Sequence, residues 1–385
     1  MRFASGYVNI NPKSPVQQAG YFGQDKPILE AHDDLNARIT YLEDQEIVIL
    51  VTIDNLGLPL SFQLDTELQL QQLFEKKVRL VIACSHTHYA GDPRDKQYRQ
   101  QIQAAIVDGV KNLDVLEYQN LYYSFTYGFF DKYGTSRISN QESKLIYLEV
   151  LSIYSDSQRL ANFLIYNCHP TLLDSKTAYF SAEYPGYVIA KLNEKYPTES
   201  FSFFQGACGD ISTRFTRESQ TYESLTKLGD ILITKILEIL DKDKPKHKIH
   251  LSYTAKYLSL EHEILDLDQM EVPDDLTERE LETVEQGKRA REILLTKIDE
   301  LPPEIMISKV GFGGYNMIFA PNELFSFYIS ALNKEKASLV CYSNGYGPYV
   351  TGIGKQRITY ELFTDTFSLK TKQEMFDLFK KLSNE

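Results

Sequence analysis

The feature that most constrains this chain is the run of residues 78–84, which is apolar, rich in β-branched side chains and followed at once by the sequence Ser-His-Thr-His. Such a run predicts a buried strand. The strand then presents His86 and His88 at its C-terminal end, where metal and catalytic groups are commonly found. An isolated His-x-His is equally compatible with two structural histidines, so the pair needs independent support.

The same pattern recurs at His169, which follows the apolar segment 162–168 and precedes Pro170. Proline cannot continue the hydrogen-bond ladder of a central strand, so it leaves the imidazole at the edge of the sheet. The chain has seven histidines in 385 residues. Two strand ends that both carry histidine therefore favour a shared metal site over unrelated structural histidines.

Periodicity predicts strands and helices that alternate along the chain. The predicted strands are 46–54, 78–84, 144–153, 162–168, 201–205, 249–258, 311–320 and 339–342. The predicted helices are 65–77, 96–112, 184–196, 218–240, 276–301, 322–334 and 370–382. Because the two kinds of element are mixed rather than segregated, we predict an α/β (mixed α+β) fold with layered mixed sheets and flanking helices.

No internal repeat and no low-complexity linker divides the chain, so residues 1–385 are expected to form a single domain. The most charged stretch, 276–301, predicts a long helix with a solvated outer face. An acidic loop, 266–275, precedes it. Together these segments indicate a helical insertion at about 266–301.

The composition excludes several classes of protein. A net charge of −12 argues against a nucleic-acid partner, because phosphate binding requires a basic face. The cysteines form no Cys-x-x-Cys motif and are expected to be buried thiols in a reducing compartment: Cys84, Cys168, Cys208 and Cys341. The N-terminus has no apolar secretion signal, and no apolar run approaches the ~20 residues of a membrane span. We expect a cytoplasmic protein without stable membrane insertion.

Further polar residues follow apolar segments near the C-terminus. Glu323 follows the apolar run 317–321 after one intervening residue, Asn322, at the start of a predicted helix, and the tyrosine-containing loop 343–350 follows the last predicted strand. Two histidines, a carboxylate and a phenolate oxygen would form a donor set suited to zinc with an open position for water. The residues alone do not decide which tyrosine takes part.

A series of short motifs in a fixed order resembles the neutral/alkaline non-lysosomal ceramidases, a family of zinc-dependent neutral ceramidases and their bacterial relatives. These motifs lie at residues 6–12, 19–21, 32–38, 53–54, 85–88, 167–171, 181–187, 206–210, 321–323 and 344–349. The resemblance implies the fold of the ceramidase N-terminal domain, so that residues 1–385 would form one catalytic domain.

The resemblance also implies a zinc ion (Zn2+) and a set of site residues. By matching motifs, the zinc ligands would be His86, His169, Glu323 and Tyr349, with Tyr346 close enough to compete for the fourth place. The second histidine of the pair, His88, would transfer a proton to the leaving amine. Arg137 falls where family members place an arginine near the scissile group.

Two departures from the family pattern qualify its activity. Some members carry a serine that has been considered a nucleophile, and Gly206 stands at that position here, which leaves water as the nucleophile. The chain also ends about 35 residues after Tyr349, too soon for the immunoglobulin-like C-terminal domain of the lipid-hydrolysing members. A membrane sphingolipid is therefore not the only candidate substrate.

The first functional hypothesis is a zinc amidohydrolase that cleaves the linear amide of a small-molecule N-acyl compound. The alternatives are a zinc hydrolase of an ester or of an amino-sugar or cell-wall amide, and a non-catalytic binding protein with a relic site. The presence of His86, His88, His169 and Glu323 together argues against a relic. The sequence specifies neither the acyl group nor the oligomeric state.

Overall fold

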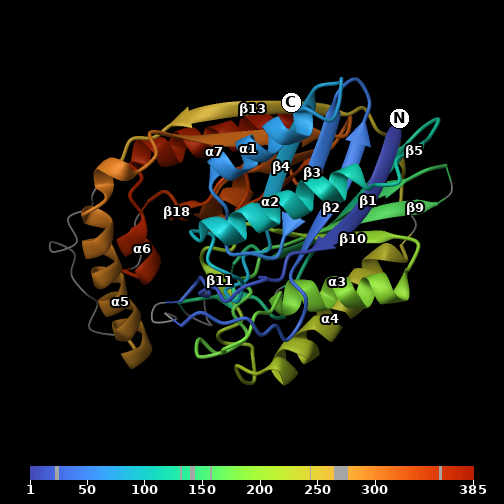
Figure 1. The fold of residues 1–385 in the computed structure, drawn as a ribbon. Helices are drawn as coiled ribbons and strands as arrows, with labels where there is room; N and C mark the ends of the chain where they lie inside the picture. The colour runs from blue at the N-terminus through green and yellow to red at the C-terminus, as the bar shows by residue number, and fades with distance from the viewer. Residues whose placement is uncertain are drawn as a thin grey trace.

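The computed structural model describes residues 1–21, 26–130, 132–138, 144–156, 158–242, 244–263, 276–354 and 358–385. Within them, mixed sheets and flanking helices form layers (Figure 1), which confirms the predicted α+β fold class. No helix in these ranges is long and apolar enough to cross a bilayer.

The first sheet has the strand order β4-β3-β2-β1-β5. Its strands are β1 (Arg2–Asn9), β2 (Asn36–Glu43), β3 (Ile47–Ile53), β4 (Val78–Cys84) and β5 (Leu116–Glu117). Every residue of β3 is buried. Alternate β3 side chains enter two different hydrophobic cores, with Ile49 and Val51 in one and Val48 and Leu50 in the other. Both faces of this sheet are therefore covered, which explains the unbroken apolar runs of β3 and β4.

The second sheet has the order β10-β9-β8-β6-β12. Its strands are β6 (Tyr122–Phe129), β8 (Tyr147–Tyr154), β9 (Arg159–Tyr166), β10 (Ser200–Gln205) and β12 (His247–Lys248). The third sheet, in the order β13-β14-β15-β17, consists of β13 (Ser252–Ser259), β14 (Glu304–Gly311), β15 (Asn316–Phe319) and β17 (Ala337–Val340). Two small sheets join β7 (Thr135–Ser136) to β11 (Ile211–Ser212) and β16 (Asn322–Leu324) to β18 (Gly347–Val350).

The helices cover the outer faces of the sheets. They are α1 (Leu60–Gln71), α2 (Lys96–Lys111), α3 (Glu183–Lys195), α4 (Tyr222–Leu240), α5 (Glu278–Leu295), α6 (Tyr360–Thr364) and α7 (Leu369–Asn384), with 3-10 turns at Ile298–Glu300 and Ser326–Ala331. Figure 1 shows α1 and α2 across the first sheet and α3 beside β10, and α4 packs on α3 and β8. One core contains side chains from all three large sheets, including Leu50, Phe163 and Met317. The sheets are thus packed on one another, with helices outside.

The parallel strand pairs position the site. In each large sheet one pair is parallel, namely β3 with β4, β9 with β10, and β15 with β17. Backbone hydrogen bonds then join the ends of these pairs, because the Cys84 N–H donates to the Tyr342 carbonyl at 2.9 Å and the Cys341 N–H donates to the Gln205 carbonyl at 2.8 Å. The C-terminal ends of strands from three sheets therefore meet at one place, which is where open α/β sheets bind ligands.

Most predicted elements are present with shifted ends, but some predictions were wrong. Residues 322–334 do not form a helix, because Asn322–Leu324 pairs in parallel with β18 and only a 3-10 turn follows. The predicted strand 311–320 contains only the last residue of β14, then a tight turn and the shorter strand β15. The strands β1, β2, β6 and β14 were not predicted as such. All four cysteines are free and buried, as predicted.

The predicted insertion is only partly visible, since residues 266–275 lie outside the described residues. Within 276–301, α5 forms as predicted and begins with a full capping box between Thr277 and Glu280. The helix packs on α6, and Val284 shares a small separate core with Phe363 and Ile358. Figure 1 shows α5 and α6 together at one side of the sheets. The polar helix α5 therefore packs on α6 through this small apolar core.

Candidate metal centre

His86 sits in a strained backbone conformation directly after β4. Its φ is 65°, a left-handed value that is unfavourable for a residue with a branched side chain. Its N–H donates to the Asn55 carbonyl at 3.0 Å, just past the end of the neighbouring strand β3. Its ring stacks on Tyr342, with ring centres 3.9 Å apart. The fold thus holds His86 from both sides in a conformation it would not adopt by itself, as is common at functional sites.

The hydrogen bonds of the histidines fix their tautomers. The Nδ1 atoms of His86, His88 and His169 lie 2.8, 3.1 and 2.8 Å from the carbonyl oxygens of Leu56, Gly20 and Cys208, respectively. A carbonyl oxygen only accepts hydrogen bonds, so each Nδ1 must carry the proton. In a neutral imidazole the Nε2 is then a bare lone pair, which is the form that binds metals.

These Nε2 lone pairs converge on Glu323. The Nε2 atoms of His86 and His169 are 3.1 Å apart, and they lie 3.4 and 3.3 Å from Glu323 Oε2. Ligands about 2.1 Å from a tetrahedral zinc are about 3.4 Å from one another, by the geometry of the tetrahedron. Glu323 Oε2 and His88 Nε2 are buried and have no hydrogen-bond partner among the described residues. Lone pairs that face one another without a proton between them fit a metal cation.

The three histidines form a candidate metal-binding group, with ring nitrogens that all lie within 4.8 Å of one another. Burial opposes ionisation of Glu323, but His86 and His169 outweigh it and hold the pKa of its carboxyl well below the usual value. Burial, with Arg137, lowers the pKa of His169 to about 4. Burial and the neighbouring His86 and His169 keep the pKa of His88 well below its usual value. His88 and His169 are therefore neutral imidazoles beside the Glu323 carboxylate near neutral pH.

Tyr346 and Tyr349 occupy different positions around Glu323. The Tyr346 hydroxyl donates to Glu323 Oε1 at 2.8 Å, on the side of the carboxylate away from the histidines. Tyr349 lies opposite Glu323 in the parallel pair β16 and β18, and its ring is nearly parallel to that of His169. Its oxygen accepts a hydrogen bond from Arg137 Nη1 at 3.0 Å. Tyr346 thus orients the carboxylate, and Tyr349 places an oxygen beside a cation that favours its ionised form.

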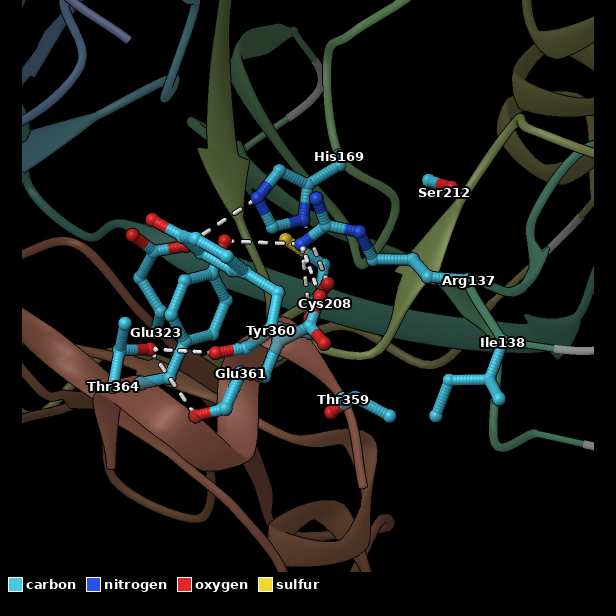
Figure 2. A network of polar contacts seen from close by, with 12 residues as sticks. Arg137, Ile138, His169, Cys208, Ser212, Glu323, Thr359, Tyr360, Glu361 and Thr364 are labelled. Atoms are coloured by element: carbon cyan, nitrogen blue, oxygen red, sulfur yellow. Dashed lines mark hydrogen bonds and ion pairs between the residues drawn. The ribbon is translucent and has the colours of Figure 1, made fainter. Parts of the chain in front are cut away.

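Arg137 is held in the wall of the pocket by groups from separate elements. Its Nη1 also lies 3.2 Å from the Gly209 carbonyl and 3.1 Å from Glu361 Oε1 in α6. Figure 2 shows Arg137, Tyr360 and Glu361 grouped beside Glu323 and His169. The guanidinium therefore adjoins the candidate metal position without contacting the histidines.

The loop that carries His169 is held by Glu183. This carboxylate accepts hydrogen bonds from the backbone N–H groups of Leu172, Leu173 and Tyr184, and it is fully enclosed at the start of α3. Burial raises its pKa from 4.5 to about 7, although the three N–H donors oppose the shift. Glu183 therefore has a structural role at the site, in addition to its place at a helix N-terminus.

A pH dependence of stability follows from Glu183. Between pH 4.5 and about 7 the folded protein binds more protons at this carboxyl than the unfolded chain does. Its contribution to the unfolding free energy therefore decreases as pH rises through this window, by about 3 kcal/mol in total. We expect urea unfolding at pH 5 and pH 7.5 to show a larger loss for the wild type than for Glu183→Gln. An equal loss in both proteins would contradict this assignment.

The position of Glu323 depends on a glycine in the neighbouring turn. A Cβ at Gly209 would lie 2.7 Å from the Glu323 carbonyl oxygen and 3.0 Å from that of Leu324, so alanine must displace β16. We expect Gly209→Ala to weaken zinc binding about 10–100-fold while every proposed ligand remains. Zinc competition with a chromophoric chelator measures this. Gly128→Ala is the matched control, because its Cβ meets nothing within 4 Å, and an equal effect there would contradict the close-approach argument.

The backbone at Gly206 leaves no space for a side chain. A Cβ there would be 2.8 Å from the Cβ of Asn167, whose side chain donates to the carbonyls of Leu145 and Ala207. A serine at this position would therefore collide with a fixed side chain unless the turn shifted.

The structure brings together His86, His88, His169, Glu323, Arg137 and Tyr349, all of which the sequence analysis selected. Glu323 lies in a strand and not at the start of a helix. Sequence reasoning missed the contributions of Tyr342, Asp210 and Glu361. No motif marks Glu361, which is close only because α6 folds back against β18. The carbonyls that fix the tautomers carry no sequence signal at all.

The layered α+β fold is shared with solved structures. Neutral ceramidase from Pseudomonas aeruginosa superposes with a TM-score of 0.77 over 99% of this chain and 74% of that one, at 14% sequence identity. A structure described as a ceramidase complexed with C2 superposes with a TM-score of 0.76, with the same coverage and identity. No protein-family model matches the chain, and no curated protein matches its sequence. The chain therefore has the neutral ceramidase fold, as the resemblance implied.

Proposed function

We propose that this protein is a zinc-dependent hydrolase that cleaves a linear N-acyl amide with water as the nucleophile. The observation that carries the proposal is the convergence of bare Nε2 lone pairs on the unpartnered Glu323 Oε2 at tetrahedral spacing. The shared ceramidase fold, including the structure described as a complex with C2, supports an amide substrate.

We assign His86, His169, Glu323 and Tyr349 as the residues that would hold the metal. Burial raises the pKa of the Tyr349 hydroxyl well above its usual value, and the nearby Arg137 opposes this. A divalent cation is the additional charge that would ionise the phenol. Tyr346 is the less suitable ligand, because its hydroxyl is already engaged with Glu323 Oε1. It supports the carboxylate from outside the metal site.

Zinc in this pocket would supply a Lewis acid that polarises the acyl carbonyl and promotes ionisation of water near neutral pH. The residues of the chain supply the proton transfers and the orientation. His88 is buried, neutral and free at Nε2, so it is suited to accept a proton and deliver it to the departing nitrogen. Arg137 is held in place by the Gly209 carbonyl and Glu361, and its guanidinium lies beside Tyr349. There it can donate a hydrogen bond to a substrate oxygen.

Hydrolysis of a fluorogenic N-acyl sphingosine by the zinc-loaded protein tests the proposal, with ester, amino-sugar amide and short N-acyl amine substrates in parallel. Turnover of any linear amide that chelation stops and added zinc restores would support an amidase. Turnover of only the ester would replace it with an esterase that uses the same pocket. The absence of hydrolysis of every substrate by protein that holds one zinc would favour a binding protein.

His88→Gln is the matched variant for the proton-transfer role. The amide side chain keeps a polar group near Gly20 but cannot move a proton. We expect zinc content to stay unchanged and kcat for the amide to fall about 100-fold or more. Loss of zinc in this variant would instead make His88 a ligand.

A further inference from the structure

Glu361 is a buried carboxylate that belongs to none of the strands that build the metal pocket. It lies in the first turn of the short helix α6, its residue is 5% exposed, and its Oε1 is 3.1 Å from Arg137 Nη1. The same nitrogen donates to the Tyr349 oxygen. Glu361 is therefore one residue removed from a proposed metal ligand, in the network of polar contacts that Figure 2 shows.

Glu361 is the carboxylate that pairs with the Arg137 guanidinium. Without it, the guanidinium would keep only the Tyr349 oxygen and the Gly209 carbonyl as partners, and it would attract a carboxylate or phosphate group on a substrate more strongly. With it, the guanidinium is paired. An anion placed beside Arg137 would also meet the Glu361 carboxylate at short range, where solvent screens little.

The Arg137–Glu361 ion pair nevertheless leaves atoms that can form hydrogen bonds to a neutral group. Arg137 Nε is buried and has no hydrogen-bond partner among the described residues. A carboxylate accepts several hydrogen bonds, so Glu361 can take a donor in addition to Arg137. The wall thus suits a group that both accepts and donates hydrogen bonds and carries no negative charge.

The anchoring of α6 places Glu361 on an element outside the strands that carry the proposed metal ligands. Phe363 packs against Gly287 of α5, where a Cβ would approach the Phe363 ring to 2.7 Å. The C-terminal side of α6 is fixed by Asp365, which accepts from the Thr351 N–H at 2.8 Å and pairs with Lys372. The residue that neutralises Arg137 is therefore carried by a separate and firmly held element.

We propose that Glu361 is a specificity-determining residue that excludes anionic groups from the subsite beside the metal, by neutralising Arg137 and presenting its own carboxylate. The inference rests on the proposed hydrolase function for its kinetic test but not for its binding test. It assigns substrate charge selectivity to α6 rather than to the strand ends that carry the metal.

The binding test uses inorganic phosphate and zinc-loaded protein in isothermal titration calorimetry. We expect Glu361→Gln to bind phosphate at least about tenfold more tightly than the wild type, because Arg137 is released. The double variant Arg137→Gln/Glu361→Gln should lose this gain, which separates Arg137 from direct binding to the metal. A gain that persists in the double variant, or no gain in Glu361→Gln, would overturn the proposal.

Glu199→Gln is the matched control. Arg159 and Glu199 form an ion pair of similar burial, at 2.6 Å, at the opposite end of β9 from His169. This variant changes the net charge by the same amount, so a general effect of charge would appear in it as well. An equal gain in phosphate affinity in Glu199→Gln would also overturn the proposal.

The kinetic test compares an N-acylglycinamide with the corresponding N-acylglycine, which differ in one negative charge. We expect wild-type kcat/KM to favour the neutral compound by at least about tenfold, and Glu361→Gln to reduce that ratio about tenfold. The wild-type ratio tests the idea even if the variant folds poorly, and a ratio near one would reject it. If neither amide is hydrolysed while the phosphate results hold, the proposed hydrolase function fails and the charge selectivity stands.

Discussion

Replacement of His169 by alanine is expected to abolish zinc binding, with the metal content falling from about one ion per chain to near zero. The variant leaves only one imidazole, one carboxylate and a tyrosine around a position that needs four donors. Loss of a residue that only hydrogen-bonds to a metal ligand already weakens metal binding by about 10–100-fold. Loss of a ligand itself should weaken metal binding by more than that. Hydrolysis should fall at least about 1000-fold, because the chemistry depends on the metal.

Zinc content by mass spectrometry and amide hydrolysis, measured on the same preparation, check this result for His169→Ala and for His86→Ala. The control is His247→Ala, since His247 is exposed in the short edge strand β12. Unchanged far-UV circular dichroism distinguishes metal loss from unfolding. Retention of one zinc ion in both site variants would reject the metal site, whereas loss in only one would require a different ligand set.

Replacement of Asp210 by alanine is expected to cause the largest loss of stability. The Asp210 carboxylate is 2% exposed, accepts from the N–H and hydroxyl of Ser326 at 2.7 and 3.0 Å, and pairs with Lys144 at 2.9 Å. Its carbonyl accepts the N–H of Arg137. Removal of one partner of a buried ion pair costs about 3–5 kcal/mol, because the other charge remains buried and unpaired.

Urea unfolding of the chelated protein measures this loss without a contribution from metal binding. Asp108→Ala serves as the control, because Asp108 is exposed and forms a surface pair with Lys111, so its effect should stay within about 0.5 kcal/mol. Asp210→Asn should fall between the two, since it keeps an acceptor for Ser326 but loses the charge opposite Lys144. An Asp210→Ala protein as stable as the control would show that Ser326 and Lys144 find other partners.

The strand ends that carry histidine could be predicted because both signals are local in the sequence: an apolar run indicates a buried strand, and a histidine follows it within a few residues. An apolar run identifies β4 and β9, and the residue after such a run must lie at the sheet edge. Ordered motifs then linked His86, His169 and Glu323 across the chain. What they could not give is which nitrogen of each imidazole is free, because carbonyls of Leu56, Gly20 and Cys208 decide it and every residue has a carbonyl.

The wrong helix at 322–334 shows the limit of periodicity. The spacing of its apolar residues suits a helix. The backbone at Glu323 instead pairs with the parallel strand β18, and Tyr328 is buried in the hydrophobic core from a 3-10 turn. Tertiary pairing therefore overrides local preference. Glu361 was missed for a related reason, since only the docking of α6 brings it to Arg137.

The meeting of three sheets at one point has a consequence for how the chain folds. His86 and His169 are 83 residues apart, and Glu323 lies in the small sheet of β16 and β18, so no early local unit contains more than a fraction of the proposed ligands. Contacts of such long sequence separation form slowly and late. A zinc ion bound at the proposed site would therefore not serve as a template for folding, as it does in a zinc finger. Zinc would instead bind the folded protein and slow its unfolding. The zinc concentration in the cell would then govern the lifetime of the folded chain rather than its rate of folding.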